Sequence, residues 1–179
     1  IGTGDWSSDV CSSDLNGKST KYYDIWCGML KRVYDPKYIQ KHPTYEGCCV
    51  YESWHNFQTF SEWIDKNYYE IEGQRMELDK DILCKGNKIY SPDTCVFVPH
   101  RINTLFIKSD KCRGDLPIGV VRVNKKYNAR CNVDKKIKNL GYYNSLEEAF
   151  EVYKNFKEKD IKKVAEEYKD KIPEKLYNA

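Results

Sequence analysis

Hydrophobic residues recur at helical spacing in two stretches of the first half of the chain. In KYYDIWCGMLKRVY, residues 21–34, apolar side chains return every three or four positions, and Asp35-Pro36 follows. Because the residue before a proline is disfavoured in a helix, we expect an amphipathic helix that ends there. The segment NFQTFSEWIDKNYY, residues 56–69, repeats the pattern. It predicts a second helix, and the aromatic stripes of both helices are typical of a protein core.

The pattern changes to short runs of strand type between residues 77 and 99. The runs ELDKDIL and CVFVP are separated by the turn-rich segment CKGNKIYSPDT, which predicts a hairpin with a long loop. The segment HRINTLF, residues 100–106, predicts a helix of two turns. The polar stretch KSDKCRGDLP then contains Gly114 and Pro117, and it indicates a domain boundary.

Three further runs predict a small antiparallel sheet, namely IGVVRV, KYNARCNV and KIKNLGYY. Side chains alternate along a strand, so one face of the second run carries Tyr127, Ala129 and Cys131. The opposite face carries Asn128, Arg130 and Asn132. We expect the first face to pack on a helix and the second to offer amides and a guanidinium.

That helix is predicted by the last long periodic segment of the chain. Ser145 and Glu148 fit a capping box, and apolar residues recur at helical spacing until Pro173. A helix of about 27 residues would be roughly 40 Å long, more than three strands can cover. Its far end must therefore pack on something else or project. The expected fold class is α+β.

The first fifteen residues differ in origin from the rest of the sequence. Back-translation of DWSSDVCSSDL, Asp5 to Leu15, yields a standard short-read sequencing adapter in frame. We therefore expect residues 1–15 to be an artefactual, disordered leader and the true chain to begin at or after Asn16. Without the leader the net charge rises from +3 to +6, and seven of the eight cysteines remain. The expected divisions are then a domain over 16–108, a linker over 109–116 and a domain over 117–179.

Positive charge is concentrated in one part of the sequence. Residues 16–110 carry 13 Lys and Arg against 13 Asp and Glu, whereas residues 111–142 carry nine against two. A local positive field favours a polyanionic partner, most commonly nucleic acid, although a solvated basic face without a partner is the alternative. Residues 1–15 lack the basic start and the apolar stretch of a signal peptide, and no apolar run is long enough to cross a bilayer. We expect a cytoplasmic protein without membrane contact, whose cysteines are reduced.

Asn and Arg on the outer strand face are suited to read base edges, because Asn pairs with adenine and Arg with guanine. The segments IGVVRVNKKYNARC and LGYYNSLEEAFEVY resemble the apetala/ethylene-response-type DNA-binding domain of plants and of phage and bacterial homing endonucleases. The resemblance implies three strands in the major groove of double-stranded DNA, with one helix behind them. It also implies two groups of DNA-binding residues. Base contacts are expected from Lys125, Asn128, Arg130, Asn132 and Asn139, and phosphate contacts from Arg122 and Lys126.

The first domain resembles a second family. YDIWCGMLKRVYD, YEGCCVYESWHNFQTFSEWI and LDKDILCKGNKIYSPDTCVFVPHRIN are together similar to the HNH-type domain of phage homing nucleases. The resemblance implies a ββα metal finger that cleaves phosphodiesters with Mg²⁺ or Mn²⁺. Asp79 and Asn103 fall at metal-binding positions, and Lys80 falls where the general-base His belongs. His100, three residues before Asn103, is the best spare ligand or base.

The lysine at the position of the base leaves the activity open. A lysine is cationic near pH 7 and does not replace a histidine base, whereas Asp81, expected on the same strand face as Asp79, could supply a second oxygen. A zinc site of Cys84 and Cys95 with Cys27 or the Cys48-Cys49 pair would match no recognised spacing. The main hypothesis is a phage-encoded DNA-binding protein of the bacterial cytoplasm, related to HNH homing endonucleases and retaining or lacking cleavage. The alternatives are a catalytically inactive regulator or phage accessory protein, and a protein that binds another protein or a small signalling molecule.

Overall fold

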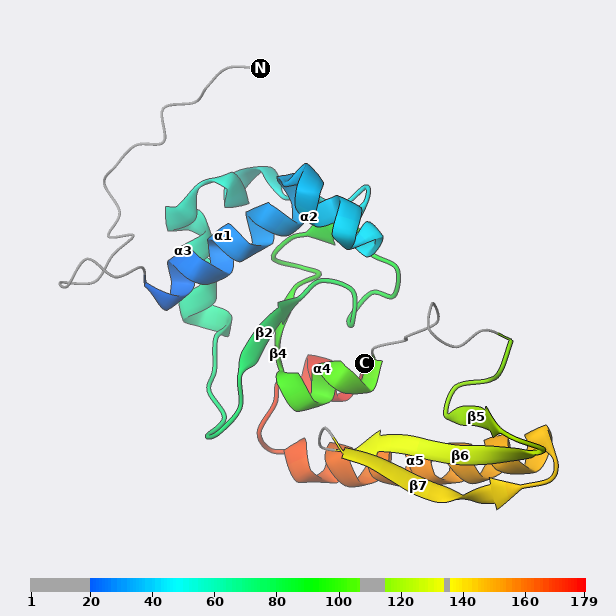
Figure 1. Ribbon diagram of the computed structural model, residues 1–179. Coiled ribbons are helices and arrows are strands. Elements are labelled where there is room, and N and C mark those ends of the chain that lie inside the picture. The colour runs from blue at the N-terminus through cyan, green and yellow to red at the C-terminus, as the bar shows by residue number, and fades with distance from the viewer. Residues whose placement is uncertain (1–19, 107–114, 134–135) are drawn as a thin grey trace. The chain divides into compact units, whose positions relative to one another are not determined.

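The computed structural model describes residues 20–106, 115–133 and 136–179 (Figure 1). The described chain is a mixture of helices and strands, and it divides into two compact units. One unit runs to Val98 and the other spans Pro99–Asn178. The expected leader and most of the expected linker, residues 109–116, lie outside the described residues. The division of domains at that linker therefore stays a prediction.

Both helices expected in the first half of the chain are confirmed. Helix α1 spans Lys21–Tyr34 and helix α3 spans Phe57–Asn67. Asp35 ends α1 and begins the short helix α2, Pro36–Lys41, because its carboxylate accepts hydrogen bonds from the backbone amides of Lys37 and Tyr38. Short 3-10 helices follow at Pro43–Tyr45 and Glu52–His55.

The strands of the first unit form two small pairs. Strand β2, Met76–Asp79, pairs with β4, Val96–Pro99, as expected for the predicted hairpin. However, β2 ends at Asp79, four residues before the end of the run ELDKDIL. The loop between them contains β3, Ile89–Tyr90, which pairs in parallel with β1, Cys49–Val50. A pair of two-residue strands has too short a pattern to be predicted.

An aromatic core holds this unit together. Trp54, Phe60 and Phe97 are almost fully buried, and Met29 of α1 packs with them. The indole nitrogen of Trp26 donates to the carbonyl oxygen of Trp54 at 2.8 Å, so the indole is buried without losing its hydrogen bond. The aromatic stripes of α1 and α3 therefore form core, as expected.

The second unit begins with α4, His100–Phe106, and is built on the predicted three-stranded antiparallel sheet. Its strands are β5, Val120–Val123, β6, Lys126–Val133, and β7, Lys136–Tyr143. Helix α5, Leu146–Tyr168, lies along one face of the sheet (Figure 1). Ala129 and Cys131 are buried against Ala149 and Tyr153 of this helix, which confirms the predicted inner face of β6.

Helix α5 begins and ends for different reasons. The Ser145 hydroxyl accepts from the amide of Glu148 at 3.1 Å, as in the expected cap, and donates to the carboxylate of Glu147. The helix ends at Tyr168, before the expected Pro173, and a short helix α6, Glu174–Tyr177, follows. The far end of α5 is buried at Val164 and Tyr168 rather than projecting. Among the described helices, none has the length and apolar character to cross a membrane.

Candidate nucleic-acid interface

The face of the sheet that turns away from α5 is polar and basic. Along β6, Arg130 and Asn132 are exposed while the intervening Cys131 is buried, so the alternation expected from the sequence is present. Across β7, Asn139 pairs with Arg130 and is also exposed. Directly opposed residues of an antiparallel pair point to the same face. Arg130, Asn132 and Asn139 therefore lie together on the outer face.

Asn128 occupies the same face but is buried. Its side-chain nitrogen donates to Asn139 Oδ1 at 2.8 Å and to the carbonyl oxygen of Gly141 at 2.9 Å. The amide of Gly141 in turn donates to Asn139 Oδ1 at 3.0 Å. These bonds use both hydrogens of the Asn128 amide group, so this residue holds β6 to β7 and has no donor left for a base.

A bulge in β7 explains why these two asparagines meet. The register pairs Ala129 with Gly141 but Arg130 with Asn139, so that Leu140 is an extra residue on β7. An extra residue reverses the alternation on the bulged strand. Asn139 and Tyr142 therefore both belong to the outer face although three positions separate them.

Tyr142 is a member of this face that the sequence reasoning did not identify. It pairs with Asn128 across the strands and is 54% exposed. The signal in the sequence was Gly141, which has a φ of +133° and marks the irregular position of β7. Only the register itself shows to which side the following tyrosine turns.

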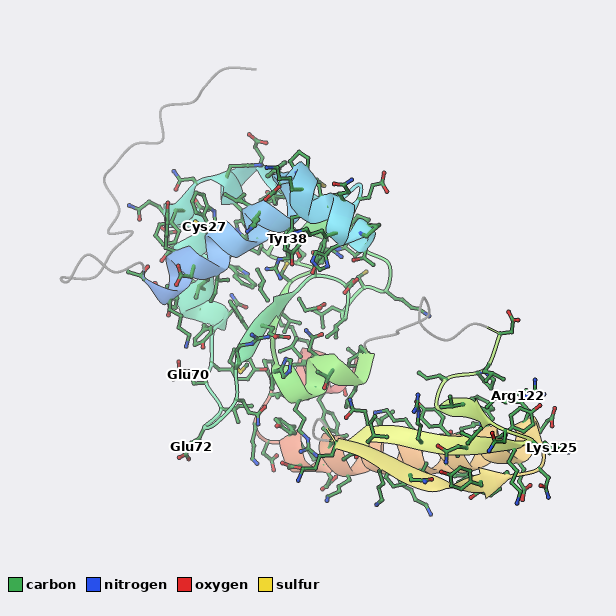
Figure 2. All side chains as sticks on the ribbon, in the orientation of Figure 1. Cys27, Tyr38, Glu70, Glu72, Arg122 and Lys125 are labelled. Atoms are coloured by element: carbon green, nitrogen blue, oxygen red, sulfur yellow. The ribbon has the colours of Figure 1, made fainter. Side chains whose placement is uncertain are left out.

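The lysines expected to contact DNA lie at the turn that joins β5 to β6. Lys125 occupies this two-residue turn after Asn124, whose φ is +55°, and Lys126 begins β6 (Figure 2). Both lysines are exposed. Arg122 is exposed as well, but its Nη2 lies 3.3 Å from the hydroxyl of Tyr127, against whose ring the guanidinium packs. Arg122 pairs with Tyr127 across the strands, so it belongs to the face of the sheet that α5 covers.

Asp79, the expected metal ligand, ends β2 with its carboxylate engaged. Oδ1 accepts from the amides of Asp81 and Ile82, each at 2.8 Å, and thereby forms the turn that ends the strand. Burial raises the pKa of Asp79, and the two amide hydrogen bonds oppose this rise. Asp81 lies beyond the end of β2, so the expectation that it shares a strand face with Asp79 is wrong.

Lys80 is buried, and its side chain is hydrogen-bonded to the loop between β2 and β3. Its Nζ donates to the carbonyl oxygen of Asn87 at 3.0 Å and lies 3.3 Å from Oδ2 of Asp81. The side-chain amide of Asn87 returns a hydrogen bond to the carbonyl oxygen of Lys80 at 2.7 Å. The two side chains thus close the loop between β2 and β3 from within.

His100 and Asn103 lie one helical turn apart on α4, in the second unit, whereas Asp79 and Lys80 belong to the first. The convergence of these four expected catalytic residues on one site therefore stays a prediction. Within the described parts of the chain no group of three or more His, Cys, Asp and Glu side chains is placed to hold a metal ion. Asn103 is outside this set of residue types, so the binding of Mg²⁺ or Mn²⁺ by Asp79 and Asn103 stays a prediction.

The other histidines make contacts of their own. His55 Nε2 lies 2.7 Å from the hydroxyl of Tyr34, and the ring of His42 packs against that of Tyr38 at 4.5 Å between centroids. Comparisons with known protein families, with curated proteins and with solved structures give no match.

Proposed function

We propose that this protein binds double-stranded DNA through the outer face of the β5-β6-β7 sheet. The observation that carries the proposal is the composition of this face. Arg130, Asn132 and Asn139 are exposed together on it, and no Asp or Glu occurs in any of the three strands. A duplex presents a dense row of phosphates, so a sheet with cations and amides but no carboxylate is electrostatically complementary to it.

The contacts within the sheet refine the roles proposed for its residues. Arg130 and Asn132 remain the candidates for base contacts, because their side chains are exposed and directed outward. Lys125 and Lys126 are exposed at the turn and are suited to phosphates. Asn128 acts indirectly in this proposal, by holding Asn139 and the bulge in place. The apetala/ethylene-response-type likeness remains part of the proposal, since it implies this same use of a sheet.

The segment from β2 to α4 is proposed to be a non-cleaving relative of the HNH finger. The order β2, β4, α4 fits a ββα arrangement, which supports the likeness. Lys80 stands where the base is expected, and its ammonium group is buried and committed to the loop carbonyl of Asn87. Asp79 Oδ1 is committed to two backbone amides. These contacts favour the inactive DNA-binding regulator over the nuclease among the hypotheses from the sequence.

DNA binding is tested by the fluorescence anisotropy of a labelled duplex at several salt concentrations. Each phosphate contact contributes about 0.9 to the slope of log affinity against log salt, so Lys126→Ala should flatten the slope by about 0.9. Arg130→Ala should weaken binding by about 1–3 kcal/mol if Arg130 contacts a base. Lys162→Ala, an exposed lysine of α5, is the control and should change neither quantity. An affinity that does not depend on salt would overturn the proposal.

Cleavage is tested separately with supercoiled plasmid and Mg²⁺ or Mn²⁺. The expected result is that the plasmid stays intact with the wild-type chain. Cleavage that Asp79→Ala abolishes would overturn the non-cleaving assignment and restore the nuclease hypothesis. The anisotropy result is independent of this outcome, because it depends on the sheet alone.

A further inference from the structure

A groove of about 900 Å³ lies in the second unit, at the side of the sheet where β5 is shorter than β6. It is bordered by the end of α4, by the residues at the start of β5 and by the end of β6, and α5 forms its floor. Strand β5 covers β6 only as far as Ala129. The inner layer of the unit is therefore open beyond that point.

Large apolar side chains collect at this groove. Phe106, Ile118, Ile137 and Ile161 all line it, and each is between 36% and 69% exposed. They come from four different elements or their flanks, so the fold and not a local run of sequence brings them together. A cluster of exposed apolar residues of this kind typically marks an interaction site.

The floor of the groove follows one face of α5 over three turns. Phe150, Tyr153, Lys154, Lys157 and Ile161 line it at helical spacing. The eleven residue steps from Phe150 to Ile161 correspond to about 16 Å along the helix axis. A trough of this length and apolar character matches a second helix of about three turns that lays its apolar face into it.

The charges of the groove indicate which helix would fit. Arg130, Lys154 and Lys157 line it as cations, and Glu158 is the one acidic residue among the described lining. The ammonium group of Lys157 is 3.5 Å from the carboxylate of Asp160, which balances part of this charge. Arg130 and Lys154 are exposed, so they can meet carboxylates on the flanks of an incoming helix.

We propose that this groove binds an acidic amphipathic helix of a partner protein. The apolar side chains of that helix would cover Ile161 and its neighbours, and its Asp and Glu residues would face Arg130 and Lys154. The charge of the groove disfavours a basic segment, and a second copy of this basic chain is disfavoured for the same reason. Arg130 belongs to both proposals, so the variants that separate them are at Ile161 and Lys154, which are not among the residues proposed to contact DNA.

The partner class is tested by selecting a random peptide display library on the full-length chain, with counter-selection on Ile161→Glu. The expected result is enrichment of peptides with apolar residues at i, i+3 or i+4 and i+7, and with Asp or Glu between them. The proposal is overturned if no peptide depends on Ile161, as when a second copy or another part of the same chain covers the groove. Enrichment of basic peptides would overturn it equally.

Binding of the best enriched peptide is then measured by fluorescence anisotropy with matched variants. Ile161→Glu should weaken binding by about tenfold or more, because it places a carboxylate in an apolar contact. The control is Ile89→Glu, since Ile89 of the first unit is exposed to a similar degree, and it should change nothing. Lys154→Glu should weaken binding and reduce its salt dependence, whereas Lys162→Glu should not.

Duplex affinity measured on the same proteins keeps this proposal distinct from the proposed function. Ile161→Glu should lower peptide affinity and leave duplex affinity unchanged. Equal loss of peptide binding in Ile161→Glu and Ile89→Glu would show that the groove is not the site, and would overturn the proposal whatever the DNA result.

Discussion

The side-chain amide of Asn128 donates both of its hydrogens within the sheet, one to Asn139 Oδ1 at 2.8 Å and one to the carbonyl oxygen of Gly141 at 2.9 Å. Two residues that the sequence suggests as base readers are thus bound to each other. The pair sits beside the bulge of β7, where the regular ladder is interrupted. Side-chain hydrogen bonds at such a place replace the backbone pairing that the extra residue disrupts.

Removal of this pair should destabilise the second unit. Asn128→Ala leaves the carbonyl oxygen of Gly141 without its side-chain donor, and we expect a loss of about 1–3 kcal/mol in unfolding free energy. Asn139→Ala should cost a similar amount. The double variant should cost less than the two single variants together, because they remove the same hydrogen bond. Urea unfolding followed by circular dichroism measures all three values.

The control for this cycle is Asn132→Ala, at an exposed position of the same strand. It should alter the unfolding free energy by no more than about 0.5 kcal/mol. Strict additivity of Asn128→Ala and Asn139→Ala would contradict a shared role in the bulge.

Gly119 should tolerate no side chain. Its φ is +80°, and a Cβ built there would overlap the ring of Tyr153 on α5. Gly73 has a similar φ of +70° but open space around it, so it isolates the cost of the backbone conformation. Gly73→Ala should cost about 1–2 kcal/mol from the left-handed conformation alone. Gly119→Ala should cost about 1–3 kcal/mol more, because the ring must move.

Chemical denaturation of the two glycine variants gives the comparison directly. A Gly119→Ala protein as stable as the Gly73→Ala protein would contradict the close contact of Gly119 with the ring of Tyr153. Loss of stability in both, with the larger loss at Gly119, is the expected result.

The elements of the fold that were predictable are those with a long pattern. These are the helices α1, α3 and α5 and the three strands of the β5-β6-β7 sheet. All of them are present in the structure. The pairing of β1 with β3 was not predictable, since two residues define no period and the partners are distant in sequence. The bulge at Leu140 was missed for a related reason, because register depends on the neighbouring strand.

The candidate residues were predictable by type but not by environment. The sequence places a lysine at the expected position of the base, but the contact of Lys80 with the carbonyl oxygen of Asn87 depends on how the loop between β2 and β3 closes. Likewise, the exposure of Arg130 follows from alternation, whereas the burial of Asn128 follows from a partner eleven residues away. The groove in the second unit combines residues from separate elements and had no local signal.

Asp79 should make the stability of the first unit depend on pH. Burial raises the pKa of Asp79 above its ordinary value of 3.8. As the pH rises from 3.8 to the higher folded pKa, the unfolded chain loses this proton before the folded chain does. The folded state then binds more protons, so the unfolding free energy falls through this window and the loss is complete above it.

Asp79→Asn removes the ionisation and keeps an oxygen that can accept from the amides of Asp81 and Ile82. The variant should therefore gain stability over the wild type as the pH rises above 3.8, and the difference should level off at higher pH. Urea unfolding across this range measures the difference. A difference in unfolding free energy that is constant with pH, or that becomes smaller as the pH rises, would contradict a raised pKa of Asp79.

Cys95 should be the least reactive of the described cysteines of the first unit. Burial raises its pKa to about 12, whereas Cys27, Cys49 and Cys84 are exposed. Because the thiolate is the reactive form, a buried thiol with a raised pKa reacts slowly. At pH 8 we expect iodoacetamide to modify Cys95 at least about tenfold more slowly than Cys84, as followed by peptide mass spectrometry. In urea the two rates should converge, which shows that the fold causes the difference, and equal rates in the folded chain would refute the burial of Cys95.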